Sequence, residues 1–154
     1  MGDPAATVVT EAAHEDASAI AAVHLIARRQ AMPYLRRAHT DDETRDYFAR
    51  VVGNQPLAWW VIREHEQVAA YMRLDGENLV HLHVLPQWQG HGLGSALLDK
   101  AKALSPDRLV LRTFQRNLNA RAFYEARGFR AIKRTKGENE EGEPDVLYEW
   151  RNAR

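Results

Sequence analysis

The chemically most informative part of the sequence is a glycine-rich turn between an apolar run and a leucine-rich run. Here Gln89-x-x-Gly92-x-Gly94 follows the apolar residues 79–85 and runs into the start of residues 93–104. At such a turn successive backbone N–H groups point outward, and the dipole of a following helix adds positive potential. Glycine also lets a phosphate oxygen approach the backbone closely. The turn therefore predicts a pyrophosphate site, although a plain strand-to-helix turn would use glycine in the same way.

Two common phosphate-binding motifs do not fit this turn. A dinucleotide fingerprint needs a third glycine where Ser95 stands, and no acidic residue is obviously placed to bind a ribose. The sequence also contains no P-loop of the form G-x-x-x-x-G-K-[ST]. If the turn binds a phosphate, it does so as another class of site.

A second segment, residues 117–129, has the spacing of a helix that presents one face to a ligand. Asn117, Ala120 and Tyr124 are separated by three and four residues, so a helix would place them on the same side. The asparagine could bind an amide of a ligand, the alanine would leave room for it, and the tyrosine would offer a phenol. Taken alone, the segment could equally be a surface helix with Phe123 packed inward.

Together the two segments resemble the GNAT superfamily of N-acetyltransferases. The first matches the pattern Q/R-x-x-G-x-G/A and the second the pattern N-x-x-A-x-x-x-Y-E-x-x-G-F. The resemblance implies acetyl-CoA as co-substrate, with its pyrophosphate on the glycine turn and its pantetheine arm between two splayed parallel strands. It places these residues at the cofactor: Leu82, His83, Val84, Gln89, Gly90, His91, Gly92, Leu93, Gly94, Ser95, Asn117, Ala120 and Tyr124.

The resemblance implies transfer of an acetyl group to an amine. The chain has no cysteine, so no cysteine acyl-enzyme can form, and direct attack of the amine on the thioester is the simpler mechanism. The attacking amine must be deprotonated, the oxyanion needs a donor and the leaving thiolate needs a proton. We expect Tyr124 to supply that proton and the backbone N–H of Val84 to bind the oxyanion.

The base that deprotonates the amine stays open among several groups. His81 and His83 lie on the strand that leads to Val84, and histidine titrates near neutral pH. A regular strand would point both to one face, whereas a bulge would re-aim one of them. Each could instead be a structural histidine, Glu77 is a weaker candidate, and a chain of water molecules could replace them all.

The elements that must position these groups alternate in type along the chain. The sequence predicts helices over residues 17–29, 40–52, 93–104 and 117–127, and strands over residues 8–9, 57–63, 68–74, 79–85, 109–114, 129–133 and 146–150. We predict an α/β (α+β) fold in one domain, residues 1–154. Its central sheet is mixed and mostly antiparallel, is flanked by about four helices, and contains one splayed parallel strand pair.

The amine pocket should form near the first two helices and the adjoining strand ends. Candidate residues for it are Tyr34, Arg36, His39, Trp59 and Trp60. We favour packing roles for both tryptophans, one on each face of the sheet, and a capping role for His39-Thr40 before the acidic start of the second helix. The acidic loop of residues 138–145 is expected to be a solvated loop, with attraction of cationic amines as the alternative. The amine itself stays open among protein N-termini, lysines, polyamines and antibiotics.

Composition limits the remaining classes of function. The 21 basic residues balance 21 acidic ones, which argues against a nucleic-acid-binding protein. No apolar run approaches the ~20 residues of a membrane span and the N-terminus lacks signal-peptide features, so we expect a cytoplasmic protein with no membrane partner and no metal. A homodimer through residues 146–150 is compatible with the sequence. The alternative functions are an acyl-CoA sensor without turnover and a transferase for a longer acyl-CoA.

Overall fold

The computed structural model describes residues 7–153, and the first six residues of the N-terminus discussed above lie outside that part. Its helices are η2 (His14–Asp16), α1 (Ala17–Ala31), α2 (Asp41–Val51), η3 (Pro86–Trp88), α3 (Leu93–Leu104) and α4 (Leu118–Glu125). Its strands are β1 (Val9–Glu11), β2 (Trp59–Glu64), β3 (Gln67–Asp75), β4 (Asn78–Val84), β5 (Arg108–Phe114), β6 (Arg130–Arg134) and β7 (Asp145–Arg151). Within residues 7–153 no helix is long and apolar enough to cross a membrane.

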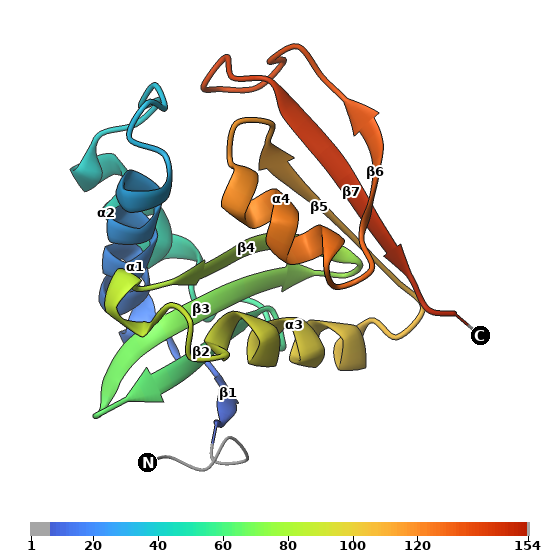
Figure 1. Cartoon of the computed structure of the whole chain (residues 1–154). Helices are drawn as coiled ribbons and strands as arrows, with labels where there is room; N and C mark the ends of the chain where they lie inside the picture. The colour runs from blue at the N-terminus through green and yellow to red at the C-terminus, as the bar shows by residue number, and fades with distance from the viewer. Residues whose placement is uncertain (1–6, 154) are drawn as a thin grey trace.

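All seven strands form one sheet in the order β1-β2-β3-β4-β5-β7-β6. Every neighbouring pair is antiparallel except β4 and β5, which run parallel. These two strands pair only at Asn78 and Val110, where the Val110 N–H donates to the carbonyl of Glu77 at 2.9 Å. Beyond that point they diverge (Figure 1). The predicted mixed sheet with a splayed parallel pair is therefore confirmed.

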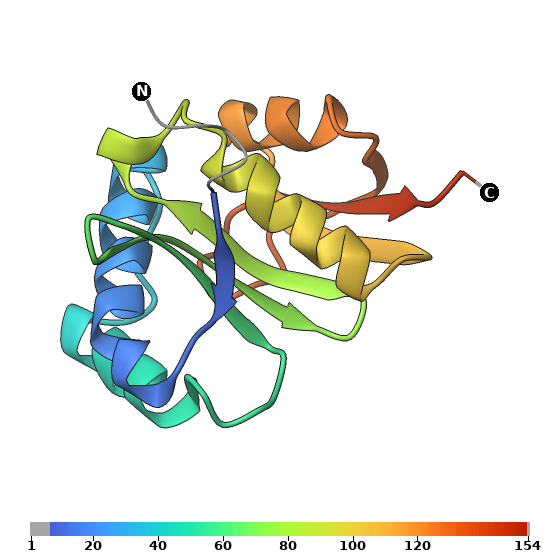
Figure 2. The ribbon, with the colours of Figure 1, turned by 90° about the horizontal axis from the view of Figure 1, so that it is seen from below.

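Helices cover both faces of the sheet, α1 and α2 on one and α3 and α4 on the other (Figure 1, Figure 2). Each face has its own apolar core, because strand side chains alternate between faces. Trp59 packs edge-on against Phe48 of α2 at 5.7 Å, whereas Trp60 lies in the core beneath α3. Both indoles are more than 90% buried, so their expected packing roles are confirmed.

The predicted elements all form, with small shifts at their ends. The first strand is Val9–Glu11 instead of residues 8–9, and the first helix runs on to Ala31, where Pro33 soon follows. Thr40 caps α2 as its composition indicated. Its hydroxyl accepts a hydrogen bond from the Glu43 N–H at 3.1 Å, and the Glu43 carboxylate accepts one from the Thr40 N–H at 2.9 Å.

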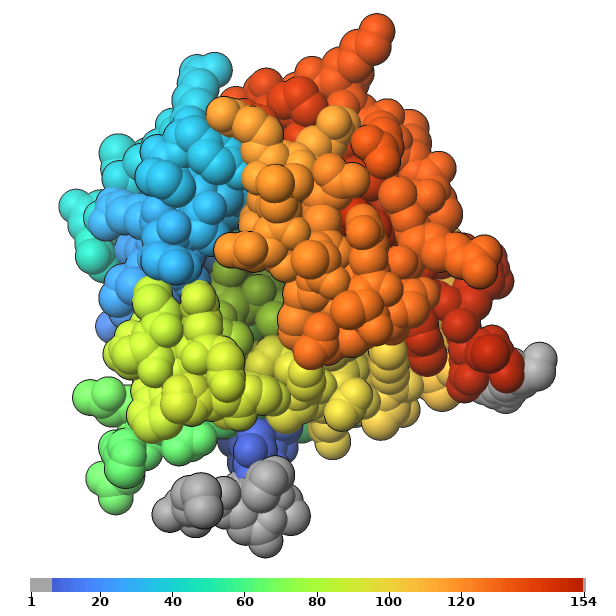
Figure 3. Space-filling model, viewed as in Figure 1, coloured from blue at the N-terminus to red at the C-terminus, as the bar shows by residue number. Residues whose placement is uncertain are grey.

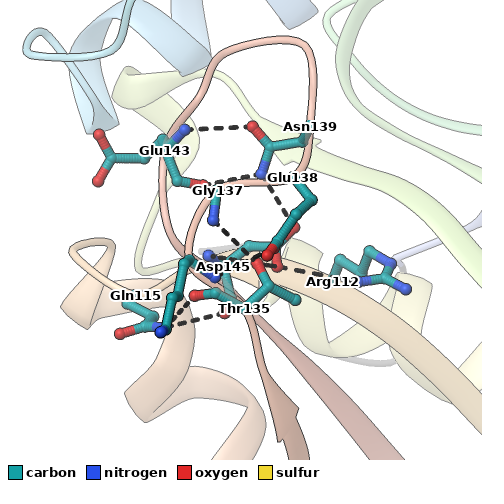
Figure 4. Close-up of polar contacts among 9 residues, drawn as sticks. Arg112, Gln115, Thr135, Gly137, Glu138, Asn139, Glu143 and Asp145 are labelled. Atoms are coloured by element: carbon teal, nitrogen blue, oxygen red, sulfur yellow. Dashed lines mark hydrogen bonds and ion pairs between the residues drawn. The ribbon is translucent and has the colours of Figure 1, made fainter.

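The loop between β6 and β7 is held to the protein, so the expectation of a solvated loop is wrong for its C-terminal end. Asp145 is only 5% exposed, and Thr135 and Asn139 donate hydrogen bonds to its carboxylate at 2.5 and 3.2 Å (Figure 4). Arg112 lies 3.8 Å from the same carboxylate, and the Gln115 amide donates to the carbonyls of Thr135 and Asp145. A buried carboxylate needs such partners because it has lost its water.

The Asn139 side chain bonds to both backbone groups of Glu143, near the C-terminal end of this loop. Its amide nitrogen donates to the carbonyl of Glu143 at 2.7 Å, and its oxygen accepts from the Glu143 N–H at 3.2 Å. These contacts add to the loop's own backbone hydrogen bond, which the Gly142 N–H donates to the Asn139 carbonyl at 3.1 Å. The loop should therefore keep its shape without a ligand.

We expect Asn139→Ala to lower the free energy of unfolding by about 1–3 kcal/mol, because it removes bonds to partly buried groups. Urea unfolding checks the stability, and amide exchange of residues 136–144 should rise. Lys136→Ala is the matched control, since only the backbone of this exposed residue makes a hydrogen bond. Equal stability of the two variants would contradict the bracing role of Asn139.

Candidate active site

A cleft of about 620 Å³ opens where β4 and β5 part. Figure 3 shows it as a recess between the N-terminal helical region, the yellow-green segment before α3, and α4. Twelve of the predicted cofactor residues line it: Leu82, His83, Val84, Gln89, Gly90, Gly92, Leu93, Gly94, Ser95, Asn117, Ala120 and Tyr124. His91 does not line it, because its ring packs against Trp88 at 5.5 Å. Only the backbone of His91 is left for a role in phosphate binding.

The edge of β4 offers free main-chain groups to this cleft. Leu85 donates its N–H to the carbonyl of Ala69 at 2.9 Å, and Val84 stands opposite Ala70. Main-chain groups of an antiparallel strand point alternately toward and away from its neighbour. Because Leu85 bonds to β3, the N–H groups of Leu82 and Val84 point away from it. The main chain of His83 is paired with β3 instead, so that residue faces the site through its side chain.

The glycine turn is shaped as an anion site. Gly90 and Gly92 have φ angles of 79° and 82°, a left-handed conformation that glycine adopts without strain. Gly92 is the N-cap residue of α3, so the free N–H groups of the first helical turn face the cleft. Gln89 donates a hydrogen bond to the carbonyl of Val84 at 3.1 Å, which ties the turn to the end of β4.

Gly94 is needed for a different reason, the close approach of α3 to α4. A Cβ atom at Gly94 would lie 3.3 Å from the Phe123 ring. Arg127 stacks over the same ring at 3.8 Å and donates to the Ser95 hydroxyl at 2.8 Å. The sequence did not single out Arg127. The only sequence feature that could have indicated a role for Arg127 is its place in the last turn of the predicted helix, three residues after Tyr124. Its guanidinium adds a positive charge beside the phosphate turn.

The face of α4 meets the cleft as predicted. Tyr124 is 8% exposed, its ring packs against Phe123 and Phe129, and burial raises the pKa of its phenol well above the ordinary value. Within residues 7–153 its hydroxyl has no hydrogen-bond partner. The oxygen of Asn117 caps the helix by accepting the Ala120 N–H at 3.2 Å, so the NH₂ group is the part free to meet a ligand.

Three histidines lie together beside the cleft. The rings of His81 and His83 are each 5.2 Å from the ring of His24 on α1. The ladder between β3 and β4 does contain a bulge, but the extra residue is Val80, ahead of both histidines. His81 and His83 therefore share one face, and the expectation that a bulge re-aims one of them is wrong. No sequence motif marks His24, which follows Ile20 and Val23 at helical spacing in α1.

All three imidazoles are neutral at pH 7. Burial, the neighbouring His83 imidazole and the guanidinium groups of Arg73 and Arg28 lower the pKa of His81 to about 3, and burial and Arg28 lower that of His83 to about 3. Burial also holds the pKa of His24 far below its ordinary value. Among the residues described, no set of three or more histidine, aspartate or glutamate side chains is arranged to hold a metal ion.

A second cavity, of about 990 Å³, lies on the other side of the histidines. It is enclosed by α1, α2, the segment between them and the β6–β7 loop. Glu141 of that loop lies 3.4 Å from Arg28, and Glu140 lies 3.0 Å from His39. The residues that line both cavities are His24, Arg28, Met32, His81 and Glu141. The two cavities therefore meet at the histidine cluster.

The predicted acceptor residues divide into two groups. Arg36 and His39 line the second cavity, and of the expected capping pair His39-Thr40 it is Thr40 that caps α2. Tyr34 lies outside both cavities and packs under the Arg116 guanidinium at 3.8 Å. Trp59 and Trp60 belong to the cores, as stated above. Glu77, the weaker base candidate, lines neither cavity and pairs with Arg108 at 3.3 Å.

Curated relatives match the chain over part of its length. Peptidyl-lysine N-acetyltransferase YjaB of Escherichia coli is 28% identical over 93 residues, which are 60% of this chain and 62% of that protein. The protein of the same name from Salmonella typhimurium is 29% identical over 77 residues, 50% of this chain and 52% of the relative. The matched segment thus spans less than two thirds of either relative.

Solved structures match the fold over nearly the whole chain. The solution structure of apo-form YjaB from Escherichia coli has a TM-score of 0.78 at 22% identity and covers 96% of this chain and 99% of that one. PaiA N-acetyltransferase from Thermoplasma acidophilum, in complex with coenzyme A, has a TM-score of 0.72 at 12% identity, with 95% and 99% covered. The profile of the acetyltransferase (GNAT) family matches residues 20–129. With its splayed strands and glycine turn, the chain belongs to the acetyltransferase (GNAT) family.

Proposed function

We propose that this chain transfers the acetyl group of acetyl-CoA to an amine in a ternary complex. The observation that carries the proposal is the meeting of two cavities at one cluster of neutral histidines. One cavity has the features of a coenzyme A cleft, and the other is open to an acceptor. Because both cores share one sheet, we also propose that residues 1–154 form a single domain of this kind.

Acetyl-CoA would lie along β4 with its pyrophosphate on the glycine turn. Free main-chain groups of Leu82 and Val84 suit the amides of a pantetheine arm, and Arg127 suits the phosphates. The Val84 N–H is the donor for the oxyanion that forms when the amine attacks the thioester carbonyl. Membership of the family, which uses acetyl-CoA, supports this placement.

Tyr124 would protonate the thiolate of coenzyme A as the carbon–sulfur bond breaks. Its phenol is held in the protonated state by burial and has no competing partner among the described residues. A neutral donor in a dry site stabilises a developing anion effectively, because little water competes for the proton.

His81 or His83 would accept the proton of the attacking amine, directly or through water. Both imidazoles are neutral at pH 7 and can therefore accept a hydrogen bond. Their low pKa also means that neither can keep a proton for long. The Arg28 guanidinium at the junction of the cavities also favours deprotonation of the amine, because its positive charge disfavours an ammonium ion there.

The lysine side chain of a peptide is the acceptor that we propose first. The two curated relatives are named peptidyl-lysine N-acetyltransferases. The second cavity carries Glu140 and Glu141 at its edge, where their carboxylates would attract an approaching ammonium ion. Release of coenzyme A in the presence of lysine peptides, N-terminally free peptides, polyamines and amino acids tests both the reaction and the acceptor class.

We expect Tyr124→Phe to lower kcat by about 10²-fold, because the thiolate loses its proton donor. The KM for acetyl-CoA should change little, since the ring stays in place and no internal hydrogen bond is lost. Thiol release under saturating acetyl-CoA measures the effect. Tyr148→Phe is the matched control, because that buried phenol lines neither cavity. A wild-type kcat in Tyr124→Phe would refute the acid role.

The acid limb of kcat/KM should follow the pKa of the acceptor amine and not that of a histidine. Since His81 and His83 have a pKa of about 3, neither titrates between pH 5 and 9. Activity should rise with pH until the acceptor is deprotonated, near ~10 for a lysine and near ~8 for an α-amino group. Rate profiles for two such peptides check this. An acid limb of kcat/KM that lies between pH 6 and 7 for both peptides would contradict this prediction.

A further inference from the structure

Three side chains from three elements are joined by hydrogen bonds behind the proposed reaction centre. The phenolic oxygen of Tyr71 on β3 lies 2.8 Å from Nδ1 of His24 on α1. The same oxygen lies 3.1 Å from Nδ1 of His81 on β4. The Nε2 atoms of both imidazoles have no bond within residues 7–153, and both rings line the two cavities. The hydrogen-bonded row His24–Tyr71–His81 thus ends in a free Nε2 atom on each side, and both ends lie at the junction of the cavities.

The chemistry of the three groups requires the two imidazoles to be in complementary protonation states. A phenol donates one hydrogen bond, and here its oxygen accepts another. When Tyr71 donates to one imidazole, the other must donate to Tyr71. One Nδ1 is then protonated and the other is not. In a neutral imidazole the proton on one nitrogen leaves a lone pair on the other, so one Nε2 is a base and the other carries a proton.

We propose that His24, Tyr71 and His81 form a proton relay for the acetylation reaction. The relay rests on the function proposed above, and it answers a need of that reaction. An ammonium acceptor loses two protons in every cycle: one replaces the proton that Tyr124 gives to coenzyme A, and the other must leave the site. It assigns a role to His24 and Tyr71, neither of which the coenzyme A site requires. Tyr71 acts here as a positioning and relaying group, because it lines neither cavity and so does not touch substrate.

Each cycle moves one proton in and one proton out. The amine nitrogen gives its proton to Nε2 of His81, and the Nδ1 proton of His81 passes to the oxygen of Tyr71. The phenolic proton of Tyr71 passes to Nδ1 of His24, and the Nε2 proton of His24 leaves to water in the acceptor cavity. Every member ends neutral. Exchange with water and rotation of the phenol restore the first arrangement.

The surroundings favour transfer over storage of the proton. The groups that raise the electrostatic cost of an imidazolium are Arg28 on α1, Arg73 on β3 and His83 on β4. Tyr47 of α2 and Arg73 act electrostatically on the phenol of Tyr71, and Glu141 of the β6–β7 loop partly offsets the charge of Arg28. Burial raises the pKa of Tyr71, so a free phenolate is disfavoured as well. A concerted shift avoids both charged states.

Aromatic packing holds the side chains of the relay in place. Tyr71 is fully buried and stacks with Trp59 at 6.2 Å, and Phe48 meets its ring edge-on at 6.0 Å. His24 packs against Phe48 at 5.0 Å. Since these rings fix the phenol between the two imidazoles, the relay needs no rearrangement before it acts.

The first test is Tyr71→Phe, which keeps the packed ring and removes the relaying oxygen. We expect kcat to fall by about 10²-fold with an unchanged KM for acetyl-CoA, because only proton transfer is impaired. Tyr148→Phe is the matched control. That phenol is also fully buried and bonded at both sides, to Arg121 and Glu125, yet lies outside both cavities. Its kcat and its pH profile should stay at the wild-type values.

A second test covers the case in which Tyr71→Phe does not fold. His24→Gln keeps a side chain that can bond to Tyr71, but an amide cannot pass a proton on, so kcat should again fall about 10²-fold. Ring ¹⁵N shifts of the free wild-type protein give a readout without catalysis. The protonated fractions of Nδ1 in His24 and His81 should sum to one. A sum near two or near zero would overturn the relay.

The outcomes separate the relay from the proposed function. Thiol release by the wild type together with full kcat in Tyr71→Phe or His24→Gln overturns the relay alone. No release from the wild type with any amine of the panel overturns the proposed function, and the relay with it. The relay is supported by a reduced kcat in both variants, a wild-type kcat in Tyr148→Phe, and Nδ1 protonated fractions of His24 and His81 that sum to one.

Discussion

The rest of the structure depends on the separation of β4 from β5 after a single pairing at Asn78 and Val110. A sheet strand that loses its neighbour leaves main-chain N–H and C=O groups without partners, which is unfavourable unless a ligand or water supplies them. At Leu82 and Val84 those groups face the cleft. The helices that follow the two strands also diverge, so that the glycine turn before α3 and the cleft-facing side of α4 flank the same opening (Figure 1). The coenzyme site is in this sense the unpaired edge of a sheet.

Much of this arrangement could be predicted because it is encoded in short segments. The turn at Gly92, the cap at Thr40 and the helix face of Ala120 and Tyr124 each depend on a few consecutive residues. The alternation of side chains in the strands is similarly local, which is why Trp59 and Trp60 could be placed on opposite faces. The splayed pair came from the resemblance carried by two motifs, and the order of elements agreed with it.

The acceptor side could not be predicted in the same way, because it is made of contacts between distant segments. His24 and Tyr71 are 47 positions apart, and each fits an apolar core pattern in its own element. The bulge at Val80 decides the face of both strand histidines, yet no glycine or proline marks it. The acidic loop had the composition of a solvated segment, whereas the burial of Asp145 depends on partners at Arg112, Thr135 and Asn139 that only the folded chain brings together.

Arg28 links these features electrostatically. Its guanidinium stands between the two cavities, where it lowers the pKa of all three histidines, and it lies 3.4 Å from Glu141 of the braced loop. Burial is the main reason that the imidazoles are neutral; the cation at the junction adds to it and disfavours a protonated amine at the same point. The carboxylates at the edge of the cavity act in the opposite sense and attract that ammonium from solution. An amine that moves inward therefore passes from a region that favours its charged form to one that favours its neutral form. The gradient promotes loss of the proton where the thioester is attacked, and it makes a path for that proton necessary.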